Sequence, residues 1–182
     1  MLIHTEHLRL LTCQHEHLEA IVREPKSLSA LLGVLIPDGW PAYSEAYPHA
    51  LESLRKDPLK PYSGWWLYLF IHSAERALVG CGGFKGPPDA DGLVEIGCEI
   101  APAYRGRGLG AEATLGLARY AFTRPQVSAV AAHTLPEKSA STRVLEKAGM
   151  KRVGQALDPE AGPVWHWRLT RDAYENKPRK AA

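Results

Sequence analysis

The chain has 182 residues, of which 45% are hydrophobic and 23% are charged. These proportions are typical of a soluble globular protein, and the length suits one compact domain better than two. The 22 Lys and Arg residues exceed the 20 Asp and Glu residues by two, which gives a formal net charge of +2. So small an excess excludes a protein that holds a polyanion by overall charge, so any anionic ligand must be bound locally.

Cysteine usage and the N-terminal segment both indicate a reducing compartment. The three cysteines, at positions 13, 81 and 98, are widely spaced and form no CxxC pair. The chain opens without the basic and apolar regions of a secretory signal, and no apolar run approaches the length of a membrane span. We therefore expect a cytoplasmic protein with no metal site that acts on neither nucleic acid nor a membrane.

Hydrophobic periodicity divides the chain into strand and helix segments. In chain order, strands are predicted at 7–13, 65–72, 77–84, 93–100, 127–133, 150–156 and 164–169, and helices at 14–23, 27–32, 42–56, 109–122 and 139–148. Pro48 makes the third of these helices irregular, because an interior proline removes a hydrogen bond. The order of the segments indicates a mixed α/β single domain over 1–175, followed by a frayed C-terminal tail over 176–182.

A glycine-rich loop between a strand and a helix carries the most information about function. Gly106, Gly108 and Gly110 alternate directly before and at the start of the predicted helix. Their backbone N–H groups can turn toward an anion without obstruction by side chains, and the helix N-terminus adds partial positive charge. Arg105 and Arg107 add fixed charge. The loop therefore predicts an anion cradle suited to a diphosphate.

Two other interpretations of this loop remain open. A simple connecting turn explains poorly why two arginines and alternate glycines precede a helix. Gly106-x-Gly108-x-x-Ala111 also fits the GxGxxA fingerprint of dinucleotide-binding oxidoreductases. That fingerprint requires an acidic residue about 20 positions further on, at the end of the next strand. Residues 123–136 contain no Asp or Glu, so the oxidoreductase interpretation is the weaker one.

Two motifs together resemble those of the GNAT superfamily of acyl-CoA N-acyltransferases. Arg105-x-x-Gly108-x-Gly110 resembles the pyrophosphate loop Q/R-x-x-G-x-G/A, and residues 141–150, STRVLEKAGM, resemble the S-x-R-V-L-E-K-x-G-F segment. Residues 5–10, TEHLRL, are similar to the T-x-R-L-x-L start of the branch that includes ribosomal-protein N-terminal acetyltransferases. The resemblance is strong over about 94–154 and weak before residue 60.

The resemblance implies a twisted sheet of about seven strands with helices on both faces, and acetyl-CoA as co-substrate. The backbone of Ile100 and Ala101 would pair with the pantetheine arm beside a splayed strand. The remaining cofactor-binding residues that it implies are Arg105, Gly106, Arg107, Gly108, Gly110, Ala111, Lys138 and Ser141. Lys138 stands where that branch has an Asn, and a lysine is better suited to a phosphate than to the pantetheine arm.

Acetyl transfer to an amine requires one group that removes a proton from the amine and another that protonates the leaving thiolate. Glu95 and Glu99 share one face of the strand before the loop, and Glu95 ranks first as the base because it matches the family's pattern. A solvent-facing strand would carry such residues in any case. Ser141 is the candidate proton donor, although it would serve equally as a helix cap. His133 and His166 are auxiliary bases of lower rank.

We therefore expect an N-acetyltransferase that moves the acetyl group of acetyl-CoA to a primary amine by direct attack in a ternary complex. Cys98 points away from the glutamates, which argues against a covalent intermediate. The identity of the acceptor, a protein N-terminus or a small molecule, stays open, as does the formation of a homodimer. We expect the acceptor groove to be bordered by Trp40, Tyr43 and Tyr47. The alternatives are a dinucleotide-binding oxidoreductase and a non-catalytic acyl-CoA-binding module.

Overall fold

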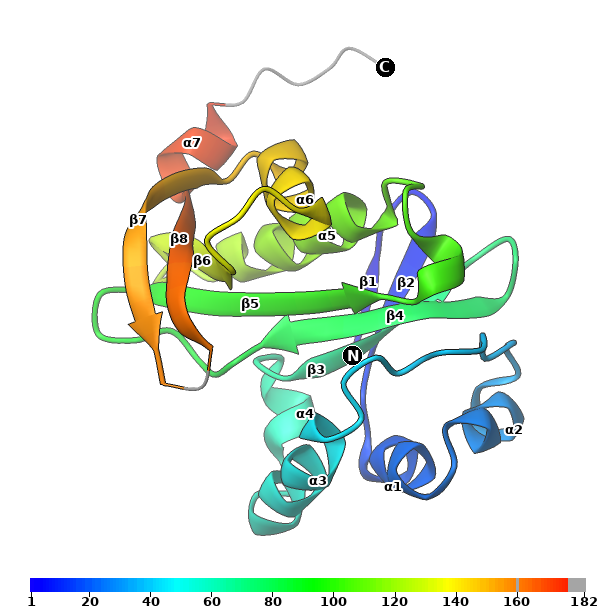
Figure 1. The fold of residues 1–182 in the computed structure, drawn as a ribbon. Helices are drawn as coiled ribbons and strands as arrows, with labels where there is room; N and C mark the ends of the chain where they lie inside the picture. The colour runs from blue at the N-terminus through cyan, green and yellow to red at the C-terminus, as the bar shows by residue number, and fades with distance from the viewer. Residues whose placement is uncertain (160, 177–182) are drawn as a thin grey trace.

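The computed structural model describes residues 1–159 and 161–176, and their strands form one sheet of eight in the order β1-β2-β3-β4-β5-β6-β8-β7 (Figure 1). The strands are β1 (Leu2–His4), β2 (Leu8–Thr12), β3 (Leu67–His72), β4 (Ala77–Phe84), β5 (Leu93–Ile100), β6 (Ala129–Thr134), β7 (Lys151–Asp158) and β8 (Gly162–Thr170). The mixed α/β class is confirmed. The sheet exceeds the expected seven strands by β1, which is too short to show a periodic pattern.

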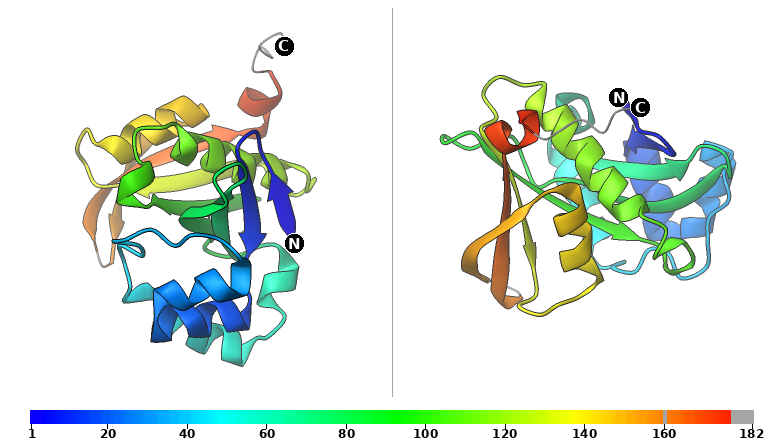
Figure 2. Two further views of the ribbon diagram at one scale, coloured as in Figure 1. Left: turned by 90° about the vertical axis from the view of Figure 1, so that its right-hand side faces the viewer. Right: turned by 90° about the horizontal axis from the view of Figure 1, so that it is seen from above.

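Helices cover both faces of the sheet, as expected. They are α1 (His15–Arg23), α2 (Leu28–Leu32), α3 (Ala46–Lys56), α4 (Lys60–Ser63), α5 (Leu109–Phe122), α6 (Ala140–Ala148) and α7 (Arg171–Glu175), with 3₁₀ turns at Pro25–Ser27 and Pro102–Tyr104. Helices α5 and α6 lie on one face and α1 to α4 on the other (Figures 1 and 2). Each layer buries its own hydrophobic cluster against the sheet.

Helix α3 is shorter than predicted, and proline chemistry explains where it begins. It starts at Ala46 rather than at residue 42, which places Pro48 in its first turn. The N–H groups of a first turn have no partner within the helix, so a proline there removes no hydrogen bond. Tyr47, Leu51 and Leu54 form the buried face of the helix.

Glycines allow β4 to pack closely in the middle of the sheet. A Cβ atom on Gly80 would lie 2.1 Å from the carbonyl oxygen of Glu99, and one on Gly82 would lie 2.4 Å from that of Gly97. Neither position accepts a larger residue unless β5 moves. Glycine usually weakens a strand, but here it permits the close approach of two backbones in a strand whose eight residues are all buried.

The strands β5 and β6 are paired over only part of their length. They are parallel neighbours from Leu93 to Glu95, opposite Ala129 to Ala131. Beyond these residues β5 continues as the antiparallel partner of β4, whereas β6 pairs only with β8. The two strands therefore diverge. We call the gap between residues 96–100 of β5 and 132–134 of β6 the V, with its apex at Glu95 and Ala131.

The C-terminal part of the chain contains one helix that the sequence did not predict. Helix α7 ends at Glu175 and is followed by its C-cap Asn176, whose N–H donates to the carbonyl oxygen of Asp172 at 3.0 Å. The rest of the predicted tail, 177–182, lies outside the described residues. None of the helices within 1–159 and 161–176 is long and apolar enough to cross a membrane.

Candidate active site

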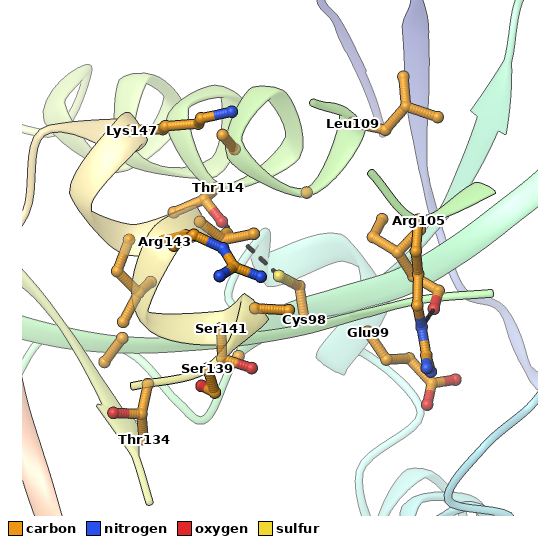
Figure 3. A pocket seen from close by; sticks show the side chains of 18 of the residues that line it. Cys98, Glu99, Arg105, Leu109, Thr114, Thr134, Ser139, Ser141, Arg143 and Lys147 are labelled. Carbon is orange, nitrogen blue, oxygen red and sulfur yellow. Dashed lines mark hydrogen bonds between the residues drawn. The ribbon is translucent and has the colours of Figure 1, made fainter. Parts of the chain in front are cut away.

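A cleft of about 640 Å³ opens at the V. Its lining comes from five parts of the chain: Tyr43, residues 96–100 of β5, positions within 104–117 of the loop and α5, residues 132–134 of β6, and positions within 139–147 at the start of α6 and along it. Figure 3 shows Arg105 on one side of this cleft and Arg143 on the other, with Cys98 and Glu99 between them. The cleft thus joins the predicted anion cradle to the strand that carries the predicted bases.

The cradle is formed by the backbone at the start of α5. Gly106 and Gly108 have φ angles of 78° and 84°, in the left-handed region that favours glycine. Gly108 is the N-cap of α5, and no side chain caps the helix. Within the described chain, the amide hydrogens of Gly108, Gly110 and Ala111 have no protein acceptor. These open donors and the helix dipole together form a site for an anionic group.

The two loop arginines point in different directions. Arg105 lines the cleft, and its Nε donates to the carbonyl oxygen of Ile100 at 2.9 Å. Arg107 instead forms an ion pair with Glu75, and its guanidinium lies 5.2 Å from the centre of the Tyr104 ring. The hydrogen bond from Arg107 lowers the pKa of Glu75. Arg107 does not line the cleft. It contacts Glu75 and Tyr104 outside the cleft, and this position differs from the predicted contact with the cofactor.

Two residues of α6 provide the cationic charge that was expected from Lys138. Lys138 lies in a separate groove of about 370 Å³ beside Trp165. Arg143 and Lys147 line the cleft instead (Figure 3). They are four residues apart and so lie on one face of the helix. The position of Lys138, which is exposed and lines the other groove rather than the cleft, does not support the prediction that it lies at the cofactor site.

The backbone of β5 presents only alternate residues to the V. The peptide groups of Glu95 and Ala101 face β4. The Glu95 carbonyl accepts a hydrogen bond from the Lys85 N–H, and the Ala101 N–H donates one to the Val79 carbonyl, both at 2.9 Å. Peptide groups alternate along a strand, so those of Ile96, Cys98 and Ile100 face the V. The predicted pairing of Ala101 with a pantetheine arm thus conflicts with its bond to Val79. Ile100 retains only its N–H, because Arg105 occupies its carbonyl oxygen.

Glu95 is held at the apex of the V by two basic side chains. Its Oε1 lies 2.5 Å from Lys85 Nζ and 2.8 Å from His133 Nδ1. Burial tends to raise the pKa of Glu95, but the hydrogen bonds from Lys85 and His133 outweigh burial and lower it. Glu95 does not line the cleft, whereas His133 does. The Glu95 carboxylate therefore stays ionised. It is connected to the cleft by its hydrogen bond with the His133 imidazole, which lines the cleft.

Glu99 lines the cleft directly and has a different environment. Its Oε1 accepts from Tyr47 at 3.3 Å and from Cys81 at 3.5 Å. Its Oε2 is buried, and the Ala42 backbone N–H interacts with the carboxyl group and opposes the effect of burial on its pKa. Burial raises the pKa of Glu99. The two glutamates thus share a strand face, but their pKa values shift in opposite directions, and of the two only Glu99 lines the cleft.

Ser141 does not cap helix α6. The N-cap is Ser139, whose side chain accepts from the Thr142 N–H, while Thr142 Oγ1 accepts from the Ser139 N–H. Ser141 is exposed and lines the cleft (Figure 3). The capping role considered for it therefore belongs to Ser139, and the Ser141 hydroxyl is free to meet a ligand.

The remaining sequence candidates lie around the cleft. Cys98 contacts Thr114 of α5 at 3.6 Å, on the sheet face opposite the glutamates, as expected. Trp40 and Tyr47 are each 5% exposed and belong to the core, whereas Tyr43 is 63% exposed and lines the cleft. Of the three aromatic residues expected to border an acceptor groove, the structure places only Tyr43 at the cleft surface.

Comparisons with known proteins agree with this architecture. Residues 7–151 match the Acetyltransferase (GNAT) domain family. The uncharacterized N-acetyltransferase YjdG of Bacillus subtilis (strain 168) is 29% identical over 170 residues, which cover 92% of this chain and 96% of that protein. The solved structure of RimL, a ribosomal L7/L12 alpha-N-protein acetyltransferase in complex with coenzyme A, has a TM-score of 0.70 at 18% identity, covering 95% of this chain and 99% of that one. AAC(6')-Ib, in complex with ribostamycin and coenzyme A, has a TM-score of 0.64 at 21% identity, covering 96% and 98%.

The chain therefore belongs to the GNAT family of acetyltransferases. It is an acetyl-CoA-dependent N-acetyltransferase, and the dinucleotide-binding alternative is not favoured. The cleft suits this donor, because an uncapped helix N-terminus and the cations Arg105, Arg143 and Lys147 surround the position for phosphates. Among the residues that the structure describes, no group of three or more His, Cys, Asp and Glu side chains could hold a metal ion.

Proposed function

We propose that the V holds both substrates at once, and that the acceptor amine attacks the thioester of acetyl-CoA directly. The divergence of β5 and β6 carries this proposal, because it connects the open amides at the N-terminus of α5 to the acidic face of β5 in one cleft. When bound, acetyl-CoA supplies an activated acyl carbonyl. The amides of Ile96 and Cys98 face the V and would hold the donor as a neighbouring strand does.

The structure supports separate roles for the polar residues of the cleft. A thiolate leaving group, whose conjugate acid has a pKa near ~8.5, departs more easily when a hydroxyl donates to it. Ser141 is exposed in the cleft and has no capping duty, so we assign it this donation. Glu99 lines the cleft and carries a carboxylate, which suits it to accept a hydrogen bond from an incoming ammonium group.

The acceptor that we propose is a primary amine, on a protein N-terminus or on a small molecule. RimL is by name an alpha-N-protein acetyltransferase, and AAC(6')-Ib was solved with ribostamycin. Similar folds therefore occur with both acceptor classes. Cys13, Cys81 and Cys98 are free thiols, which is consistent with the reducing cytoplasm expected from the sequence. A homodimer remains a prediction that light scattering would test.

The proposal is tested by the release of thiol from acetyl-CoA with a panel of acceptors. The panel contains peptides with free N-termini, polyamines and aminoglycosides, and N-acetylated peptides serve as the matched control. At least one free amine should accelerate thiol release and gain an acetyl group by mass spectrometry, while its blocked counterpart does neither. Binding of coenzyme A without acceleration by any amine would contradict the proposal and favour an acyl-CoA-binding module.

A further inference from the structure

The apex of the V contains a carboxylate–imidazole pair that the roles above do not use. His133 Nδ1 lies 2.8 Å from Glu95 Oε1. An ionised carboxylate can only accept hydrogen bonds, so Nδ1 must carry the hydrogen. In a neutral ring the opposite nitrogen, Nε2, is then the acceptor, and no described residue hydrogen-bonds to it. The pair therefore presents a fixed proton acceptor on a residue that lines the cleft.

The position of this pair matches the end of an extended ligand in the V. Because the cleft is lined by the α5 N-terminus and by residues 96–100 of β5, a ligand anchored at that N-terminus would enter beside Ile100 and run along β5 toward Ile96. Four residues of strand span about 13 Å, and the free edge ends where β6 begins to pair with β5. His133 is two residues beyond Ala131, the last paired residue of β6, so it stands beside the point that such a ligand reaches last.

We propose that His133, positioned by Glu95, is the group that removes a proton from the acceptor amine. The inference rests on the proposed function. The R–NH₃⁺ group gives one proton to His133 Nε2, and the nitrogen lone pair then forms the C–N bond at the thioester carbonyl. The C–S bond breaks, and the sulfur receives the second proton of the nitrogen by way of the Ser141 hydroxyl. His133 returns its proton to solvent.

The neighbours of His133 suit this role. Glu95 on β5 balances the charge of a protonated ring, and Lys85 keeps that carboxylate ionised. On β8, the ring of His166 stacks on His133 with centroids 4.9 Å apart. Burial lowers the pKa of His166, and the nearby His133 and Arg168 lower it further. These effects favour the neutral form of His166, so it does not compete with His133 for the proton.

Kinetics of His133→Gln and Glu95→Gln test the proposal with the best amine of the panel. General-base assistance contributes about 10² to 10⁴-fold. His133→Gln should lower kcat/KM for the amine about 100-fold at pH 7, and the loss should shrink near pH 10, where the amine is neutral without help. Glu95→Gln should cause a smaller loss and move the acid limb of the profile to lower pH. An equal loss at every pH, or none, would overturn the assignment.

Two further measurements separate this inference from the proposed function. His15→Gln, on the exposed start of α1, is the matched control and should leave kcat/KM and the pH profile unchanged. Long-range ¹H–¹⁵N NMR of the wild-type protein needs no turnover and no folded variant. It should show that the uncharged His133 ring carries its hydrogen on Nδ1 and not on Nε2. The Nε2–H tautomer would overturn the pair even in a fully active enzyme.

Discussion

The two ends of the cleft are constructed in different ways. The cradle end consists of consecutive residues, and its ligand-binding atoms are backbone amides at the start of α5. The acceptor side instead consists of side chains that are far apart in the sequence: those of β5, β6 and β8 at the apex, and Glu99 with Tyr47 of α3 and Cys81 of β4 nearer the open end of the V. A backbone site depends on glycines and on where one helix begins, whereas a side-chain site depends on strand register.

This difference has a functional consequence. A site made of backbone amides tolerates many side-chain changes, provided that its glycines remain. The acceptor side can instead change through single substitutions at His133, Glu99 or Tyr43 without affecting the cradle. Changes in the two ends should therefore separate experimentally into donor binding and acceptor chemistry.

The largest effect is expected from Gly108→Trp, which would fill the cradle. Gly108 lines the cleft at a φ of +84°, and a Cβ there meets no atom within 4 Å, so the ring would extend into open space. We expect calorimetry to show at least ~100-fold weaker binding of coenzyme A, about 2.7 kcal/mol. Gly162→Trp is the matched control, since Gly162 has a φ of +75° and open space but lies at the start of β8, outside the cleft. Equal affinity in both variants would show that phosphates bind elsewhere.

A smaller loss is expected when one cation of the cradle is removed. Arg143→Ala or Lys147→Ala should each weaken coenzyme A binding about tenfold at low salt, because a charge-assisted hydrogen bond contributes about 1.5–3 kcal/mol. The loss should decrease as salt rises. Lys138→Ala is the control, because Lys138 lies in the separate groove. The affinity of this variant for coenzyme A should equal that of the wild type. A tenfold loss in Lys138→Ala alone would reverse this assignment.

On the acceptor side of the cleft, Glu99→Gln should weaken the use of the acceptor amine and leave the binding of the donor unchanged. Glutamine keeps an oxygen for Tyr47 and Cys81 but loses the charge that attracts an ammonium group. We expect KM for the amine to rise about tenfold, with coenzyme A affinity unchanged, because one charged hydrogen bond becomes neutral. A higher Kd for coenzyme A with an unchanged KM for the amine would place Glu99 at the donor end instead.

The smallest effect is on stability, and its sign follows from the raised pKa of Glu99. Folding into this site disfavours the charged carboxylate, so the folded protein binds the proton more tightly than the unfolded chain. The penalty is present above the folded-state pKa and disappears as pH falls below the ordinary glutamate value. Glu99→Gln should thus resist urea slightly better than wild type at pH 7 and no better near pH 4. A loss of stability at pH 7 would contradict the penalty.

Elements and motifs that depend on neighbouring residues could be predicted from the sequence. The periodic pattern gave α5 at 109–122, β4 at 77–84 and β5 at 93–100, and the structure has the same bounds. The cradle could be predicted because glycine spacing and the helix start are local properties. Pro48 misled the boundary of α3 only because the sequence does not reveal which residue forms the first turn.

Side-chain directions could not be predicted, because they depend on distant partners. Arg107 is turned from the cleft by Glu75, which is 32 residues away. Arg143 and Lys147 could have been found by placing 139–148 on a helical wheel, where they share a face, had the position of α5 been known. The approach of His133 to Glu95 depends on the parallel register of β5 and β6, which no local pattern records.

Initial-rate kinetics with both substrates varied test the central claim most directly. If the V holds the donor and the amine together, double-reciprocal plots should intersect, and coenzyme A should remain able to bind the protein in the absence of an acceptor. Parallel lines, together with an acetylated protein isolated after incubation with acetyl-CoA alone, would show a covalent intermediate and contradict direct attack in the V.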